Sequence, residues 1–210
     1  MSMSENKTIL QQVEGYVKEL LDNQLPPDIT FHTLEHTQQV VGAVNVIGSQ
    51  EEITRQEMEI LILSAWFHDV GFIRSYHKHE ERSASIAFDF LSNLGYDKGS
   101  IDQIVANIKA TCLPQRPVNF MEEILCDADL FHLSQPDYWK RNQVLRRELE
   151  LCFGIYYEDI HWFRENLKFL QGHRYFTHYG RTVLENGKEQ KVAKNIKIVE
   201  RLDSGIQECD

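Results

Sequence analysis

Hydrophobic residues recur at the spacing of an α-helix along almost the whole chain, and the alternation that a half-buried strand requires is hard to find. In the first such stretch, Ile9, Val13 and Val17 share one stripe, and the Pro-Pro pair at 26–27 ends it. The same spacing predicts helices over about 7–22, 33–48, 54–68, 80–94, 100–110, 120–130, 138–152, 156–170 and 190–202. The chain is therefore predicted to be all-α, with non-helical links at 113–117 and 172–187.

The predicted helix over 54–68 is apolar almost without interruption from 60 to 67. Such a segment is buried on most sides, so its C-terminal end is expected to lie deep in the molecule. The helix before it is predicted to start at Thr33, a residue suited to capping, and to stop at Gly48. Polar residues that directly follow position 67 are therefore expected to be buried as well.

The composition is that of one globular domain. With 210 residues, 42% of them hydrophobic, the chain is long enough to bury one substantial core. No internal repeat, low-complexity tract or Ser/Gly-rich linker divides it. We therefore expect a single domain over 1–210.

The charge balance argues against a polyanionic partner. Acidic residues outnumber basic ones by 32 to 22, a formal net charge of -10, so binding to nucleic acid or to an anionic membrane is not expected. No apolar run has the length of a membrane span, and the first seven residues lack the apolar stretch of a signal peptide, which predicts a cytoplasmic protein. The four cysteines are widely separated and are expected to be free thiols: Cys112, Cys126, Cys152 and Cys209.

Side chains that can bind a metal ion occur in three separated clusters, each on a helix or at its end. The first is Phe-His-Thr-Leu-Glu-His-Thr at 31–37, the second Phe-His-Asp-Val-Gly at 67–71 and the third Leu-Cys-Asp-Ala-Asp-Leu at 125–130. Imidazole nitrogens and carboxylate oxygens suit zinc, manganese, iron or nickel better than an ion that prefers thiolates. His68 and Asp69 can bind the same ion only if the helix end turns both side chains towards one point.

Each cluster alone has a commoner explanation. A His-Asp pair is usually a surface or helix-end arrangement, His36 could be a core histidine with a hydrogen-bond partner, and aspartates near helix ends often act as caps. Burial changes this comparison, because ionisable groups beside Trp66, Phe67 and Leu125 are costly to bury unless they are paired or bind a metal. A shared metal ion would satisfy all of them together.

The order and context of these clusters resemble the HD-domain superfamily of metal-dependent phosphohydrolases. The signature of that superfamily is a histidine, a His-Asp pair at the end of a buried helix, and a later aspartate that follows alanine. His36, His68 with Asp69, and Asp129 match it in that order. The resemblance implies an HD-type helical bundle in which these four residues bind one divalent metal ion: manganese, iron, nickel, zinc or magnesium. It implies that Asp127 supports the ligands.

The resemblance covers about 32–133. A metal-binding core is therefore expected over about 30–135, followed by a C-terminal helical extension over about 136–205. The stretch around His32 and His36 is also similar to cyclic-nucleotide phosphodiesterases, in which the first histidine protonates the leaving oxygen and the second, four residues later, binds metal. By this resemblance His32 is the candidate general acid, since an imidazole exchanges protons near neutral pH. A supporting or capping role for His32 is the alternative.

Superfamily members with two metal ions use an extra histidine at about the position of His79, and in other members a His-Glu pair lines the pocket. The stretch 104–111 offers no histidine where a further ligand of a second ion would be expected. We therefore expect one metal ion, with His79 and Glu80 near the substrate as candidate catalytic residues. Lys109, Arg116 and Arg74 are candidate phosphate contacts, with a solvated position as the commoner alternative.

The resemblance implies an enzyme that hydrolyses a phosphomonoester or phosphodiester of a small, nucleotide-like molecule with a metal-activated water, which Asp69 would orient. Two alternatives are open: an iron-dependent oxygenase on the same fold, and a non-catalytic ligand-binding or regulatory module. The missing later histidine counts against a di-iron oxygenase, and the full ligand set counts against the module. The sequence leaves open the metal, the substrate and whether the chain forms a homodimer.

Overall fold

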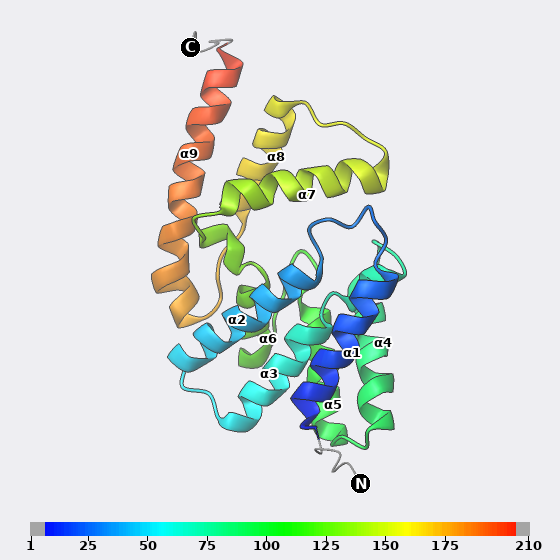
Figure 1. Ribbon diagram of the computed structural model, residues 1–210. Coiled ribbons are helices and arrows are strands. Elements are labelled where there is room, and N and C mark those ends of the chain that lie inside the picture. Colours follow the sequence, from blue (N-terminus) through cyan, green and yellow to red (C-terminus); the bar gives the residue numbers. More distant parts are fainter. Residues whose placement is uncertain (1–6, 205–210) are drawn as a thin grey trace.

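The computed structural model describes residues 7–204, and Figure 1 shows them as a set of packed helices. No strand occurs in this part of the chain, so the predicted all-α class is confirmed. The elements are α1 (Ile9–Gln24), α2 (Leu34–Gln50), α3 (Arg55–Phe67), η1 (Val70–Ile73), α4 (His79–Asn93), α5 (Lys98–Ala110), α6 (Phe120–Asp129), η2 (Phe131–Ser134), α7 (Tyr138–Phe153), α8 (Asp159–Gly172), η3 (Gly180–Leu184) and α9 (Glu185–Asp203).

Local sequence determines where two of these helices begin. The Thr8 hydroxyl accepts the N–H of Gln11, and the Gln11 side chain accepts the N–H of Thr8. Thr54 and Glu57 form the same reciprocal pair at the start of α3. Each pair satisfies backbone donors that have no partner within the helix. Thr33 stands at the start of α2 as predicted, but its side chain makes no capping hydrogen bond.

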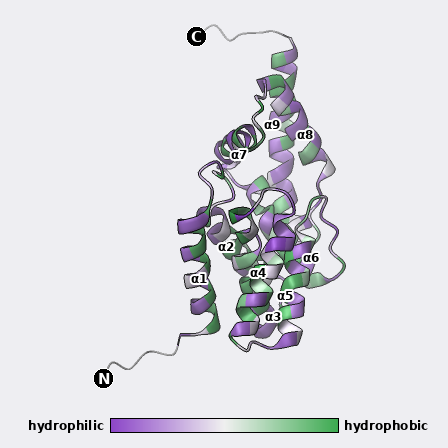
Figure 2. Cartoon of the chain, turned by 90° about the vertical axis from the view of Figure 1, so that its right-hand side faces the viewer, coloured by the Kyte–Doolittle hydropathy of each residue, from purple (hydrophilic) through white to green (hydrophobic). Residues whose placement is uncertain are grey.

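Helix α3 runs through the middle of the core and contacts α1, α2, α4, α5 and α6. One hydrophobic cluster joins it to α1, α4 and α5, and a second joins it to α2 and α6. Hydrophobic residues on α1 face the other helices while hydrophilic residues lie on its outer side (Figure 2). Because α3 is enclosed, its C-terminal end at Phe67 lies in the interior, as the sequence predicted.

Helices α7, α8 and α9 lie together on one side of the core helices (Figure 1). A third hydrophobic cluster joins η2 to α7 and α8 through Leu130, Leu133, Tyr138 and Leu170. Helix α9 packs along α8 and against η2. The short helix η2, which directly follows α6, therefore connects the core to the C-terminal helices.

Two glycines that the sequence suggested as helix ends or links lie inside helical segments instead. Helix α2 continues past Gly48 to Gln50, and the link predicted over 172–187 is shorter because a π-helical turn, η3, begins at Gly180. A Cβ atom at Gly48 would lie 2.7 Å from Met58 Cε, and one at Gly180 would lie 2.3 Å from Asp127 Oδ2. Both glycines permit close packing rather than a change of chain direction.

Cys112, Cys126 and Cys152 are free thiols, as predicted. Cys209 and residues 1–6, where no signal segment was expected, lie outside the described residues. Within 7–204, none of the helices combines the length and the apolar character needed to cross a membrane.

Candidate metal centre

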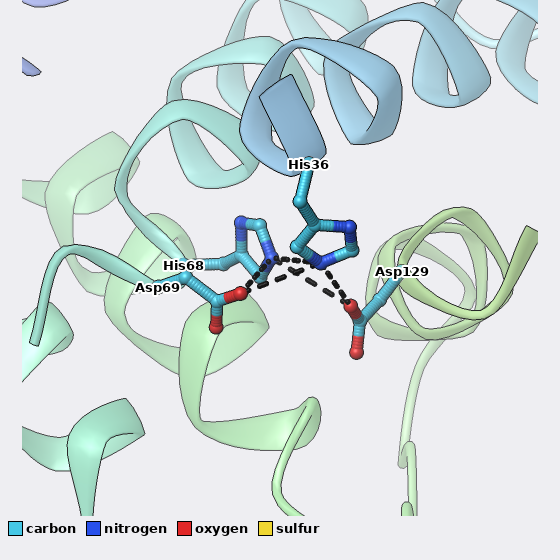
Figure 3. A group of neighbouring side chains, drawn as sticks. All are labelled: His36, His68, Asp69 and Asp129. Carbon is cyan, nitrogen blue, oxygen red and sulfur yellow. Dashed lines mark hydrogen bonds and ion pairs between the residues drawn. The ribbon is translucent and has the colours of Figure 1, made fainter. Parts of the chain in front are cut away.

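The four side chains predicted to bind metal come together from three segments of the chain. His36 lies in the first turn of α2, His68 and Asp69 follow the end of α3, and Asp129 is the last residue of α6. One ligand atom from each lies within 4.8 Å of the other three. His36 Nε2 is 3.2 Å from Asp129 Oδ1, and His68 Nε2 is 3.0 Å from Asp69 Oδ2 (Figure 3). The two Nε2 atoms are 3.4 Å apart.

The burial of this group is what a metal ion would explain. His68, His36 and Asp69 are only 0%, 2% and 4% exposed. Asp69 Oδ2 is buried and makes no hydrogen bond, although it lies within 3.4 Å of both histidines. Buried polar atoms without partners are costly, and a cation between two imidazole nitrogens and two carboxylate oxygens removes that cost. The donor set therefore fits a divalent metal ion.

The two histidines differ in how well they are prepared to bind metal. His68 Nδ1 lies 2.8 Å from the carbonyl oxygen of Ala65, to which it can donate, so that Nε2 keeps a free lone pair. His36 Nδ1 lies 3.2 Å from Nη2 of Arg141, which has donors only. If His36 binds metal through Nε2, Nδ1 carries the proton and this contact with Arg141 must open.

The charges of the four groups depend on one another. Burial lowers the pKa of His68, but Asp69 and Asp129 outweigh burial and hold that pKa well above its ordinary value. Burial also raises the pKa of each carboxyl group, but the neighbouring imidazoles outweigh it and hold both values below the usual range. Protons on the imidazoles thus balance the carboxylates, and a metal ion would take over this positive charge.

Comparison with known proteins gives one informative likeness. No model of a known protein family and no curated protein matches the chain. A solved structure at 1.45 Å, from an uncultured Thermotogales bacterium and described as a predicted HD superfamily hydrolase, matches with a TM-score of 0.59. The match spans 97% of this chain and 96% of the other, at 17% identity. The chain has the HD-domain fold.

The second oxygen of Asp69 faces the first turn of α4. His79 Nε2 lies 3.4 Å from Asp69 Oδ1 and 3.5 Å from Glu80 Oε1. Gly71 allows this approach, because a Cβ atom there would lie 2.0 Å from the carbonyl oxygen of His79. The hydroxyl of Ser83 accepts the N–H of Gly71 and fixes the same contact. His79 and Glu80 therefore lie beside the four residues, and their expected place near the substrate stays a prediction.

The ring of Phe72 separates the two histidines outside the group of four. It stacks on His32 with the ring centres 4.3 Å apart and on His79 with the centres 3.9 Å apart. His32 and His79 thus face the centre from opposite sides of one aromatic ring.

Glu148 on α7 holds His32, and no pattern in the sequence indicated this contact. Its carboxylate accepts the N–H groups of Phe31 and His32 at 2.6 and 3.1 Å, and it lies 2.5 Å from His32 Nδ1. The side chain of Glu148 is completely buried. Burial raises its pKa, but the hydrogen bonds and the charge of His32 outweigh burial and lower it. A carboxylate in contact with Nδ1 directs Nε2 of His32 away from Glu148 and leaves it free for chemistry.

The expected supporting role of Asp127 is wrong. Its oxygens accept the N–H groups of Phe176 and Thr177 and the Thr177 hydroxyl, at 2.7 to 2.9 Å. Asp127 thus holds the segment before η3 against α6 rather than the metal ligands. The reason is helical geometry: residues two apart on a helix point in different directions, so Asp127 and Asp129 cannot face the same site.

Two further residues near the centre had been missed. His132 on η2 follows Asp129 by three residues, and its Nδ1 lies 3.2 Å from the Asp129 carbonyl oxygen. Burial and the charges of His36 and Arg141 lower the pKa of His132 to about 3, so it is neutral. The helical spacing from Asp129 was a signal that could have found it. Arg141, which contacts His36 from α7, carried no such signal.

A cavity of about 500 Å³ opens beside the centre and is lined by Asp69, Asp129, His32, His79 and Glu80. Much of its remaining lining comes from η2, α7 and α8 and is mostly apolar or aromatic. The candidate phosphate contacts Arg74, Lys109 and Arg116 are exposed, and none of them lines this cavity.

Proposed function

We propose that the protein is a metal-dependent phosphohydrolase that cleaves a phosphomonoester or phosphodiester of a small, nucleotide-like molecule. The observation that carries the proposal is the meeting of two imidazoles and two carboxylates, with ligand atoms within 4.8 Å, beside a cavity large enough for such a molecule. The likeness of the fold to a protein described as a predicted HD superfamily hydrolase supports it.

His36, His68, Asp69 and Asp129 would hold one divalent ion, which when bound polarises a phosphoryl oxygen and makes a water molecule acidic enough to attack near neutral pH. Asp69 Oδ1 points away from His68 (Figure 3) and lies 3.4 Å from His79 Nε2, which in turn lies 3.5 Å from Glu80 Oε1. The carboxylate oxygens of Asp69 and Glu80 and the imidazole of His79 can orient the attacking water and accept its proton. Positioning of this kind contributes a large share of the rate in hydrolytic enzymes.

His32 is the proposed general acid. It lines the same cavity as Asp69 and Asp129, and Glu148 holds its Nδ1, so that Nε2 can donate a proton to the leaving oxygen. Phe72, stacked on the ring, keeps it from rotating. An alkoxide leaving group gains most from such a proton, because it is a poor leaving group as an anion.

The test is a panel of phosphomonoesters and phosphodiesters with manganese, nickel, magnesium, zinc and iron, run on the wild type and on Asp69→Ala. Substitution of supporting residues around a metal costs about 10–100-fold in metal affinity or activity, so loss of a direct ligand should lower turnover more than about 100-fold. Asp102→Ala, at an exposed position on α5, is the matched control and should behave as the wild type.

Metal analysis and oxygen uptake accompany the panel. We expect about one equivalent of metal in the wild type, much less in Asp69→Ala, and no oxygen consumption. Wild-type turnover by Asp69→Ala would rule out hydrolysis at this centre, and metal-dependent oxygen uptake would favour the oxygenase alternative.

A further inference from the structure

The described residues that line the cavity beside the metal centre include histidines but no lysine or arginine. Glu80 and Glu165 add to the carboxylates of Asp69 and Asp129. A metal ion can balance the two ligand carboxylates and a single phosphoryl group. A second phosphate or a carboxylate further along the substrate, away from the histidines, would meet no lysine or arginine in this cavity, and burying it there would be costly.

Two asparagines interrupt the apolar part of the wall. Asn142 on α7 and Asn166 on α8 are 6% and 9% exposed. The indole N–H of Trp162 donates to Asn142 Oδ1 at 2.7 Å, and the Tyr138 hydroxyl donates to Asn166 Oδ1 at 2.7 Å. An indole nitrogen can only donate, so the orientation of the Asn142 amide is fixed.

Each amide therefore has its oxygen occupied and its NH₂ group left over. Asn166 Nδ2 is buried without a hydrogen-bond partner among the described residues. Buried donors of this kind are rare in folded proteins and call for an explanation such as a ligand. A ligand with acceptor atoms at this wall would supply the missing partner.

Apart from Glu165, the remaining wall around these amides is apolar and aromatic. Leu145 and Leu149 come from α7, Trp162 and Phe169 from α8, and Tyr157 from the loop between the two helices. Flat or apolar groups gain contact area against such side chains, and aromatic rings stack on one another. The chemistry of the wall therefore favours an uncharged group over one that carries a second phosphate or a carboxylate.

We infer that α7 and α8 form a subsite for the organic half of the substrate, an uncharged, flat or apolar group with hydrogen-bond acceptors, and that the amides of Asn142 and Asn166 select it. This inference rests on the proposed function, because it places the single phosphoryl group at the metal centre. Asn142 and Asn166 are specificity residues and touch no reacting atom.

The first test compares two monoesters with the metal-loaded protein. Thymidine monophosphate has an uncharged base with two carbonyl acceptors, and phenyl phosphate has a flat group without them. One hydrogen bond to an uncharged partner changes affinity by up to about tenfold, so kcat/KM should favour the thymidine ester by about that factor. Thymidine diphosphate should be a poor substrate.

The variants Asn142→Asp and Asn166→Asp replace each donor by an acceptor of the same size and keep an oxygen for Trp162 and Tyr138. The added charge acts on the phosphoryl group of both esters, so the informative quantity is the ratio of the two kcat/KM values. We expect each variant to lower this ratio by about tenfold. Asn186→Asp, at an exposed position on α9, should leave it unchanged. Melting curves confirm that the variants fold.

The second test does not depend on turnover. Thymidine, which lacks a phosphate, should change the fluorescence of Trp162 in a saturable manner, and the change should be lost in Trp162→Phe and weakened in Asn166→Asp. If no ester is hydrolysed with any metal but thymidine binds in this way, the proposed function fails and the subsite stands. If both monoesters are hydrolysed equally well and the Asp variants keep the wild-type ratio, the subsite is wrong and the proposed function stands.

Discussion

Replacement of Glu148 by glutamine tests whether this residue positions the proposed acid, His32. Glutamine has the same size and can still accept the N–H groups of Phe31 and His32, but it removes the negative charge that lies 2.5 Å from His32 Nδ1. Hydrogen bonds to charged groups contribute about 1.5–3 kcal/mol. If that energy is lost from the transition state, kcat falls by about 10–100-fold, which does not exceed the roughly 100–10,000-fold that general acid catalysis supplies.

The assay compares an alkyl phosphate with nitrophenyl phosphate, whose leaving group departs as a stable anion. We expect Glu148→Gln to lower kcat for the alkyl ester by the full factor and for the nitrophenyl ester by less than about threefold, because only the alkoxide needs the proton. Metal content should not change. Glu200→Gln, at an exposed position on α9, is the matched control.

His32→Asn should show the same dependence on the ester, and the double variant should lose little more than either single variant, because the two residues act as a unit. Equal losses on both esters would mean that Glu148 only stabilises the fold. An unchanged kcat for the alkyl ester would refute the role of His32 as the acid.

Three further predictions concern stability. Asp127→Asn leaves buried backbone donors poorly paired and should lower the free energy of unfolding in urea by about 1–3 kcal/mol. Burial raises the pKa of Asp127 to about 6, so between about pH 4 and pH 6 the folded state keeps a proton that the unfolded chain releases. The wild type should therefore lose stability as the pH rises through this range, and Asp127→Asn should lack this dependence on pH. Gly71→Ala places a methyl group against the His79 carbonyl and should cost about 1–3 kcal/mol; an unchanged melting temperature would contradict the packing described. Adding manganese at about 100 times its dissociation constant should stabilise the metal-free wild type by about 2.7 kcal/mol in thermal melts, and Asp69→Ala should show no such response.

Local sequence determined most of the helices and half of the centre. The burial of the segment before His68 follows from its continuous apolar run, and the turn after it follows from the helix end, so the meeting of His68 and Asp69 could be predicted from the residues alone. The chemistry of the sequence also marked the clusters that contain His36 and Asp129, but only the resemblance to a superfamily selected these two residues as ligands. Nothing local indicates which distant segment a buried helix end will meet.

The residues that were missed belong to long-range contacts. Glu148 lies 116 positions from His32, and Arg141 lies 105 positions from His36, and neither has a neighbour in sequence that marks it. The error at Asp127 is different, because helical spacing alone places Asp127 and Asp129 on different sides of α6. The link predicted over 172–187 was too long, because Gly180 begins a helical turn and allows close packing there.

One carboxylate joins the two ends of the site. Glu148 on α7 binds the backbone just before α2 as well as the His32 ring, so the C-terminal helices and the entry to the first metal-binding helix are fastened to each other. A fragment that stopped after η2 would keep His36, His68, Asp69 and Asp129 yet lose the partner of His32 and one side of the cavity. Such a fragment is expected to capture a cation but to leave it open to bulk water.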